Sequence, residues 1–96
     1  MIPSQLIKAK HAEIMALSRQ FAVENLRVFG SVAKGLDTEN SDLDILVDTT
    51  AKTTMFDLCG LQAELEDLLG IKVDVLTPRS LPEKFRRQVL AEAKAL

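Results

Sequence analysis

The residues that decide the fold run from Leu26 to Asp48 and read LRVFGSVAKGLDTENSDLDILVD. Two short apolar runs, 26–29 and 43–47, lie on either side of a turn and a polar loop. Runs of β-branched and aliphatic residues that are bounded by turn residues are typical of strands. Because the connection between them is short, the sequence predicts an antiparallel pair, with about one helical turn at 31–35.

Longer periodic segments flank these two strands. Apolar residues at helical spacing predict a first helix from Ser4, which can cap its start, to about Val23. A second helix is expected over 55–69, with Thr53 or Thr54 as its cap and Gly70 at its end. Its apolar stripe consists of Leu58, Leu61, Leu65, Leu68 and Leu69.

The last third of the chain predicts one strand and one helix. The strand covers 71–76, and the helix runs from Leu81 to about Glu92 with Pro82 in its first turn. The residues of this helix expected to face the core are Phe85, Val89 and Leu90. The connection from 47 to 71 contains a helix and is therefore long enough for a parallel crossover.

The order of elements is helix, strand, turn, strand, helix, strand, helix. This order predicts an α/β (α+β) fold, in which a small mixed sheet of three strands or slightly more is flanked by helices. A length of 96 residues predicts a single domain, 1–96.

Composition argues against several classes of function. Twelve basic and 14 acidic residues give a net charge of about −2, so no basic excess indicates direct nucleic-acid binding. No apolar run reaches about 18 residues, and the first residues lack the pattern of a signal peptide, so we expect a cytoplasmic protein without membrane contact. Cys59 is the only cysteine, which excludes a disulfide framework and predicts a buried, inert thiol.

Three aspartates are the candidate catalytic and metal-binding residues. Asp42 and Asp44 stand at i and i+2 around the second strand, so their side chains point to the same face. Two carboxylates this close repel each other unless a proton or a divalent cation lies between them. Oxygen ligands without His or Cys favour Mg²⁺, or Mn²⁺, over zinc. Asp74, between two valines of a later strand, is the third candidate for this site.

A second group of residues can bind the phosphates of a nucleotide. Gly30 allows close approach of the backbone, and the Ser31 hydroxyl with the following amides can bind phosphate oxygens. Lys34 can neutralise phosphate charge, although a solvent-exposed loop lysine explains it equally well. Ser41 precedes the first aspartate and can orient it.

These residues resemble the DNA polymerase β-like nucleotidyltransferase superfamily. The shared pattern is Gly-Ser, a helical turn, a Gly, then Ser-Asp-x-Asp, and a third Asp on a later strand; here it reads GSVAKGLDTENSDLDILVD and KVDVL. In size and layout the chain looks most like the minimal nucleotidyltransferase (MNT) antitoxins that are encoded with HEPN-domain toxins. The resemblance implies the minimal nucleotidyltransferase fold, with two metal ions bound by Asp42 and Asp44, a site completed by Asp74, and a triphosphate held by Gly30 and Ser31.

The same resemblance implies a reaction and a partner. The expected activity is Mg²⁺-dependent transfer of AMP from ATP to a tyrosine hydroxyl of a HEPN RNase toxin, which would make the chain an antitoxin, with Asp74 as the general base. One position departs from the family, because many minimal members have Arg where this chain has Lys34. Lysine keeps the charge but lacks the bidentate fork of arginine.

Two other interpretations remain open at this stage. In the first, the chain is a non-catalytic module that neutralises a toxin by covering it. The presence of all three aspartates and of the Gly-Ser pair favours the enzyme. In the second, the nucleotide is transferred to an RNA end, against which stand the acidic pI of about 5.3 and the lack of a basic groove.

Overall fold

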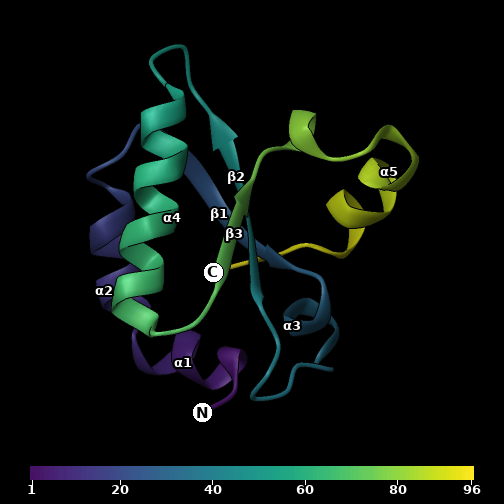
Figure 1. The fold of residues 1–96 in the computed structure, drawn as a ribbon. Coiled ribbons are helices and arrows are strands. Elements are labelled where there is room, and N and C mark those ends of the chain that lie inside the picture. Colours follow the sequence, from purple (N-terminus) through teal and green to yellow (C-terminus); the bar gives the residue numbers. More distant parts are fainter.

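The structure, a computed structural model, describes all 96 residues (Figure 1). Its helices are α1 (Pro3–Ala9), α2 (His11–Ser18), α3 (Ser31–Lys34), α4 (Met55–Leu69) and α5 (Glu83–Glu92). Its strands are β1 (Val23–Phe29), β2 (Leu43–Thr49), β3 (Val73–Leu76) and β4 (Lys94–Ala95), and a 3₁₀ turn, η1, covers Pro78–Ser80. None of the helices has the length and apolar character that crossing a bilayer would require.

The strands form one mixed sheet in the order β3-β2-β1-β4. β1 and β2 are antiparallel, and β2 and β3 are parallel, which confirms both predicted pairings. β4 is an additional edge strand that pairs antiparallel to β1. It has only two residues, too few for a periodic pattern, so the sequence did not predict it. The observed four strands agree with the predicted sheet of three or slightly more.

Helices α2 and α4 lie side by side on one face of the sheet and bury its apolar side chains (Figure 1). Alternate residues of β2 point into this core, which fixes the register of the strand. The core residues from β1, β2 and β3 are Leu26, Val28, Leu43, Ile45, Val47, Val73 and Val75. The intervening residues of β2, among them Asp44, therefore point to the opposite face of the sheet.

Helix α4 has the predicted bounds, 55–69, and its buried stripe is Leu61, Leu65 and Leu69. Thr54 forms a capping box, in which its hydroxyl accepts from the N–H of Asp57 and the Asp57 carboxylate accepts from the N–H of Thr54. The Asp57 carboxylate also accepts from the N–H of Ala22. These backbone hydrogen bonds, first that of Thr54 and then that of Ala22, lower the pKa of Asp57.

We expect Thr54→Ala to lower the free energy of unfolding by about 1 kcal/mol, because the cap hydroxyl is lost while α4 remains packed. Urea denaturation would measure the change. Lys52→Ala is a suitable control, because Lys52 is exposed in the preceding turn and its side chain makes no hydrogen bond. An equal effect of the two substitutions would show that the cap contributes nothing beyond the turn.

Helix α4 also covers the open edge of β3. The carboxylate of Glu66 accepts from the N–H of Val73 at 3.1 Å, and the amide oxygen of Gln62 accepts from the N–H of Val75 at 3.0 Å. Unpaired edge groups of this kind otherwise invite pairing with another chain. The two bonds flank Asp74, so this part of β3 is held between β2 and α4.

The first predicted helix is wrong in its extent. The chain breaks at Lys10 (φ −115°, ψ 21°) into α1 and α2, and helical structure stops at Ser18. A straight helix over 4–23 would be about 30 Å long, whereas the seven-residue strands that it would cover span about 23 Å. Because of this break, α1 changes direction and lies at the lower end of the sheet in Figure 1. Ser4 is not the cap, because Ile2 occupies that position and Pro3 begins the helix.

Three side chains expected in the core are exposed. Cys59 lies on the solvent side of α4, about 200° around the helix from buried Leu61. Phe85 and Leu90 of α5 are 51% and 39% exposed. Helix α5 lies on the sheet face opposite α4 (Figure 1) and contributes only Val89 to the small cluster of Phe29, Leu46 and Leu81 there.

Candidate active site

Two of the three candidate aspartates face each other across the parallel pair. Asp44 of β2 and Asp74 of β3 are direct register partners, and adjacent strands lie about 4.8 Å apart. Both are half-buried, and both belong to the sheet face that α2 and α4 leave uncovered. The prediction that Asp74 lies beside Asp44 therefore agrees with the register of the strands.

The surroundings of Asp44 disfavour its negative charge. Burial raises the pKa of Asp44, and the neighbouring charges of Asp74 and then Asp42 raise it further. Lys72 lowers it by a smaller amount. A carboxylate under like-charge repulsion and partial desolvation gains from any cation that binds beside it. The arrangement therefore favours a bound cation.

Asp42 stands just before β2, and its side chain is 50% exposed. Its carboxylate lies 3.9 Å from Nζ of Lys72, itself 65% exposed. As they stand, no three acidic, histidine or cysteine side chains converge into a formed metal site. The donor set is nevertheless that of a hard divalent cation, with oxygen ligands alone, and Asp42 can leave its exposed lysine at little cost. The chemistry of these donors therefore suits Mg²⁺, and the metal site itself stays a prediction.

The Gly-Ser turn closely approaches one member of this acidic pair, Asp44. Phe29, the last residue of β1, is the register partner of Asp44, and Gly30 follows at φ 71°, ψ −147°, a conformation close to a region that only glycine adopts readily. A Cβ at Gly30 would lie 2.6 Å from Oδ2 of Asp44. The absent side chain therefore lets residues 30–34, the candidate phosphate-binding turn (called the phosphate turn below), approach the carboxylate.

Helix α3 begins at Ser31, and its first hydrogen bond runs from the Lys34 N–H to the Gly30 carbonyl at 3.2 Å. The amides before Lys34 precede this bond and are available to an anion. Nζ of Lys34 lies 3.8 Å from the Glu92 carboxylate of α5, so this lysine bridges two elements. Gly30 is thus adjacent to Asp44 and Ser31 follows it in the chain, whereas Lys34 pairs with Glu92, so the nucleotide contacts of Ser31 and Lys34 stay predictions.

Ser41 is engaged elsewhere. Its hydroxyl accepts from the N–H of Thr38 at 2.8 Å and lies 3.4 Å from the Thr38 hydroxyl. These contacts close the loop that leads into Asp42. The structure therefore gives Ser41 a part in shaping the loop, and its predicted nucleotide contact stays a prediction.

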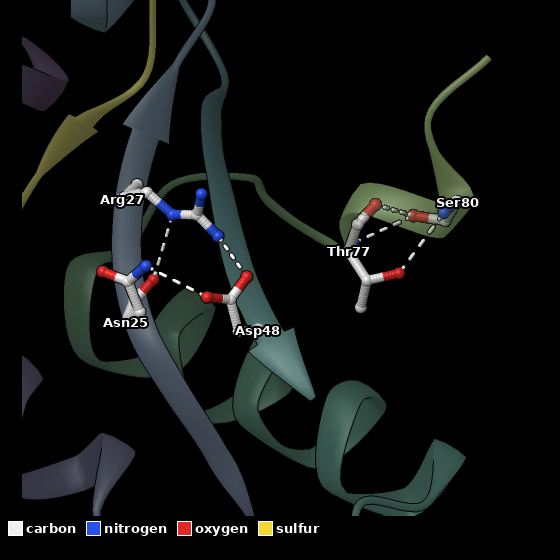
Figure 2. Close-up of polar contacts among 5 residues, drawn as sticks. All are labelled: Asn25, Arg27, Asp48, Thr77 and Ser80. Atoms are coloured by element: carbon white, nitrogen blue, oxygen red, sulfur yellow. Dashed lines mark hydrogen bonds and ion pairs between the residues drawn. The ribbon is translucent and has the colours of Figure 1, made fainter. Parts of the chain in front are cut away.

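Asp48 lies at the far end of β2 and belongs to a different network (Figure 2). Its carboxylate pairs with the Arg27 guanidinium at 2.5 Å and accepts from the Asn25 amide at 3.0 Å. Asn25 has a positive φ of 54° within a bulge of β1. Figure 2 also shows Thr77 and Ser80, whose mutual hydrogen bonds close the turn η1. Asp48 therefore ties β1 to β2 and is separate from the acidic pair.

The sequence reasoning missed Lys72 and the exposed Phe85. Lys72 precedes Asp74 by two residues, and this alternation was a signal that both could face the same carboxylates. Phe85 has the spacing of a core residue, so the sequence held no signal for its exposure.

Comparison with known proteins finds one matching family model and several similar proteins. The family model described as Polymerase beta, Nucleotidyltransferase matches residues 13–96. The chain is similar to the protein adenylyltransferase MntA of Thermococcus cleftensis, with 38% identity over 76 residues, or 79% of this chain and 77% of the relative.

Two solved structures share the fold. One, provisionally identified as a minimal nucleotidyltransferase, has a TM-score of 0.81 and 36% identity, covering 97% of this chain and 93% of the other. The second is a toxin–antitoxin crystallised with AMP-PNP. Its TM-score is 0.72 at 27% identity, over 88% of this chain and 69% of the other.

Proposed function

The chain belongs to the polymerase beta nucleotidyltransferase family, and we propose that it transfers AMP from ATP to a hydroxyl group of a partner protein. The observation that carries the proposal is the close approach of Gly30 to Asp44, whose register partner on β3 is Asp74. This approach would let phosphates bound at the Gly-Ser turn lie beside the two carboxylates. Similarity to a protein adenylyltransferase supports AMP as the group and a protein as the acceptor.

In this proposal, different residues bind the triphosphate and accept the proton. The amides and hydroxyl at Ser31, with Lys34 released from Glu92, hold the triphosphate. The acceptor oxygen attacks the α-phosphorus, the bond to the β-phosphate breaks, and pyrophosphate leaves. Asp74 takes the proton from the acceptor hydroxyl as the bond forms.

Asp42, Asp44 and Asp74 would hold Mg²⁺, as one ion or two. Bound there, the metal neutralises charge that develops on the phosphates. Before it binds, Lys72 pairs with Asp42 and eases the repulsion within the acidic group. Lys72 is exposed, so it can yield this position without a buried charge being left unpaired.

We propose a toxin as the partner. The second structural neighbour, at 27% identity, is a toxin–antitoxin crystallised with an ATP analogue. The sequence resemblance points to a HEPN RNase and a tyrosine acceptor.

A labelling experiment tests the function. The purified protein is mixed with Mg²⁺ and lysate of its native host, and with ATP labelled at the α- or the γ-phosphate. We expect the α-label to appear on one discrete protein and the γ-label to remain in pyrophosphate. Transfer of the γ-label would indicate phosphorylation, and α-label on RNA would indicate an RNA acceptor; either result would contradict the proposal.

A further inference from the structure

A groove of about 360 Å³ lies between the phosphate turn and α5. Gly30 and Lys34 line one side, and Phe85, Gln88, Val89 and Glu92 of α5 line the other. Of the five cavities in the structure, this is the one that Gly30 and Lys34 line. Its volume falls at the lower end of the range for small-molecule sites, about 300–1,000 Å³.

We propose that this groove binds the base of the nucleotide, so that α5 determines which nucleotide the enzyme accepts. The inference rests on the proposed function, because it extends the same site from the phosphates to the base. The groove is continuous with that site. Gly30 both lines it and abuts the Asp44 carboxylate, so a nucleotide with its phosphates at the turn has its nucleoside within reach of α5.

The walls of the groove offer the apolar surface that a base needs. The chain has neither Trp nor Tyr, so among aromatic residues only its four phenylalanines can stack on a base. Two of them, Phe29 and Phe85, line this groove. Phe29 is 9% exposed, whereas Phe85 is 51% exposed. The exposed ammonium of Lys84 lies over the Phe85 ring, with its Nζ 5.9 Å from the ring centroid. Phe85 therefore presents a ring that is open to a ligand.

The rim of the groove carries polar groups that can exchange partners. Nε2 of Gln88 donates to the Glu92 carboxylate at 3.3 Å, and the other oxygen of the same carboxylate pairs with Lys34. Both contacts are exposed, so breaking them costs little. A nucleotide in the groove would draw Lys34 to its phosphates and leave the Gln88 amide free to hydrogen-bond the edge of the base.

Binding measurements separate the base from the phosphates. Titration calorimetry with Mg²⁺ compares ATP with inorganic tripolyphosphate, which lacks base and sugar. We expect Phe85→Ala to weaken ATP binding about tenfold, or about 1.4 kcal/mol, and to leave tripolyphosphate binding unchanged. Phe85→Tyr, which keeps a stacking ring, should bind ATP like the wild type. Leu90→Ala is the matched control on α5, because Leu90 is exposed but does not line the groove.

Each other outcome has a distinct meaning. Equal ATP affinity of Phe85→Ala and the wild type would overturn the proposal, as would an equal loss of ATP and tripolyphosphate, which would show that the ring only supports the turn. Unchanged ATP affinity with a raised KM for the protein acceptor would assign the groove to the acceptor and also overturn it. A wild type that binds neither ligand would instead refute the proposed function.

Discussion

Asp44→Asn should lower the rate of AMP transfer by a factor of about 10²–10³ and, at neutral pH, raise the melting temperature of the protein. The loss of activity follows from removing a charge that faces the reacting phosphates. The gain in stability follows from the raised pKa of Asp44, which burial and then the charges of Asp74 and Asp42 produce. Asparagine has nearly the same shape and carries no charge, so the repulsion in the folded state disappears.

The pH dependence of stability shows why the substitution should raise the melting temperature. A carboxyl with a raised folded-state pKa binds its proton more tightly in the folded state, so stability is lost as pH rises from the unfolded-state pKa, about 3.9, through the folded one. The difference in melting temperature between Asp44→Asn and the wild type should therefore be largest at neutral pH and should vanish below about pH 4. Calorimetric melting between pH 3.5 and 8 would measure it.

Asp48→Asn is the control on the same strand and face. Its carboxylate is paired with Arg27 and Asn25, so the substitution should cost stability and spare AMP transfer. Added Mg²⁺ should raise the melting temperature of the wild type and of Asp48→Asn more than that of Asp44→Asn. An Asp44→Asn protein that melts below the wild type at neutral pH would contradict the account of a repelled carboxylate.

The same variant separates catalysis from simple covering of a toxin. Asp44→Asn should still bind the partner, because asparagine has nearly the same shape as aspartate and leaves the surface outside the site unchanged. If the enzyme neutralises its partner by AMP transfer, this variant binds and fails to protect cells. Full protection by Asp44→Asn would favour the non-catalytic module.

The sequence predicted the parts of the fold that depend on short-range patterns. The two strands around the Gly-Ser turn and the helix over 55–69 each carry their own boundary signals, and their positions are close to those predicted. β4 and the break at Lys10 have no such signals, because both depend on which distant residues they pack against. Local sequence cannot encode that information.

The shared face of the candidate aspartates could also be predicted from a short-range pattern. The parity of a strand fixes which side chains share a face, so the common face of Asp44 and Asp74 followed from their apolar neighbours. Parity does not report side-chain partners across the sheet or between helices. The pairing of Lys34 with Glu92 and the loop bonds of Ser41 therefore became visible only in three dimensions.

Gly30→Ala should lower the rate of AMP transfer about 100-fold and cost about 1–3 kcal/mol of stability. The stability cost reflects a backbone at φ 71°, ψ −147°, which residues with a Cβ avoid. The rate loss reflects the new Cβ, which would lie 2.6 Å from Oδ2 of Asp44. The carboxylate is short and half-buried, so it would have to turn away from the site, and a displacement of about 1 Å can cost this much in rate.

Gly35→Ala separates the two effects. Gly35 also has φ 71°, but nothing lies within 4 Å of a Cβ placed there. Its substitution should cost about 1–2 kcal/mol through backbone strain and leave AMP transfer close to that of the wild type, once both are compared below their melting temperatures. Urea denaturation and the labelled-ATP assay would give the two quantities. Equal losses of transfer in both variants would mean that the contact between Gly30 and Asp44 has no part in the reaction, and that only the flexibility of the turn matters.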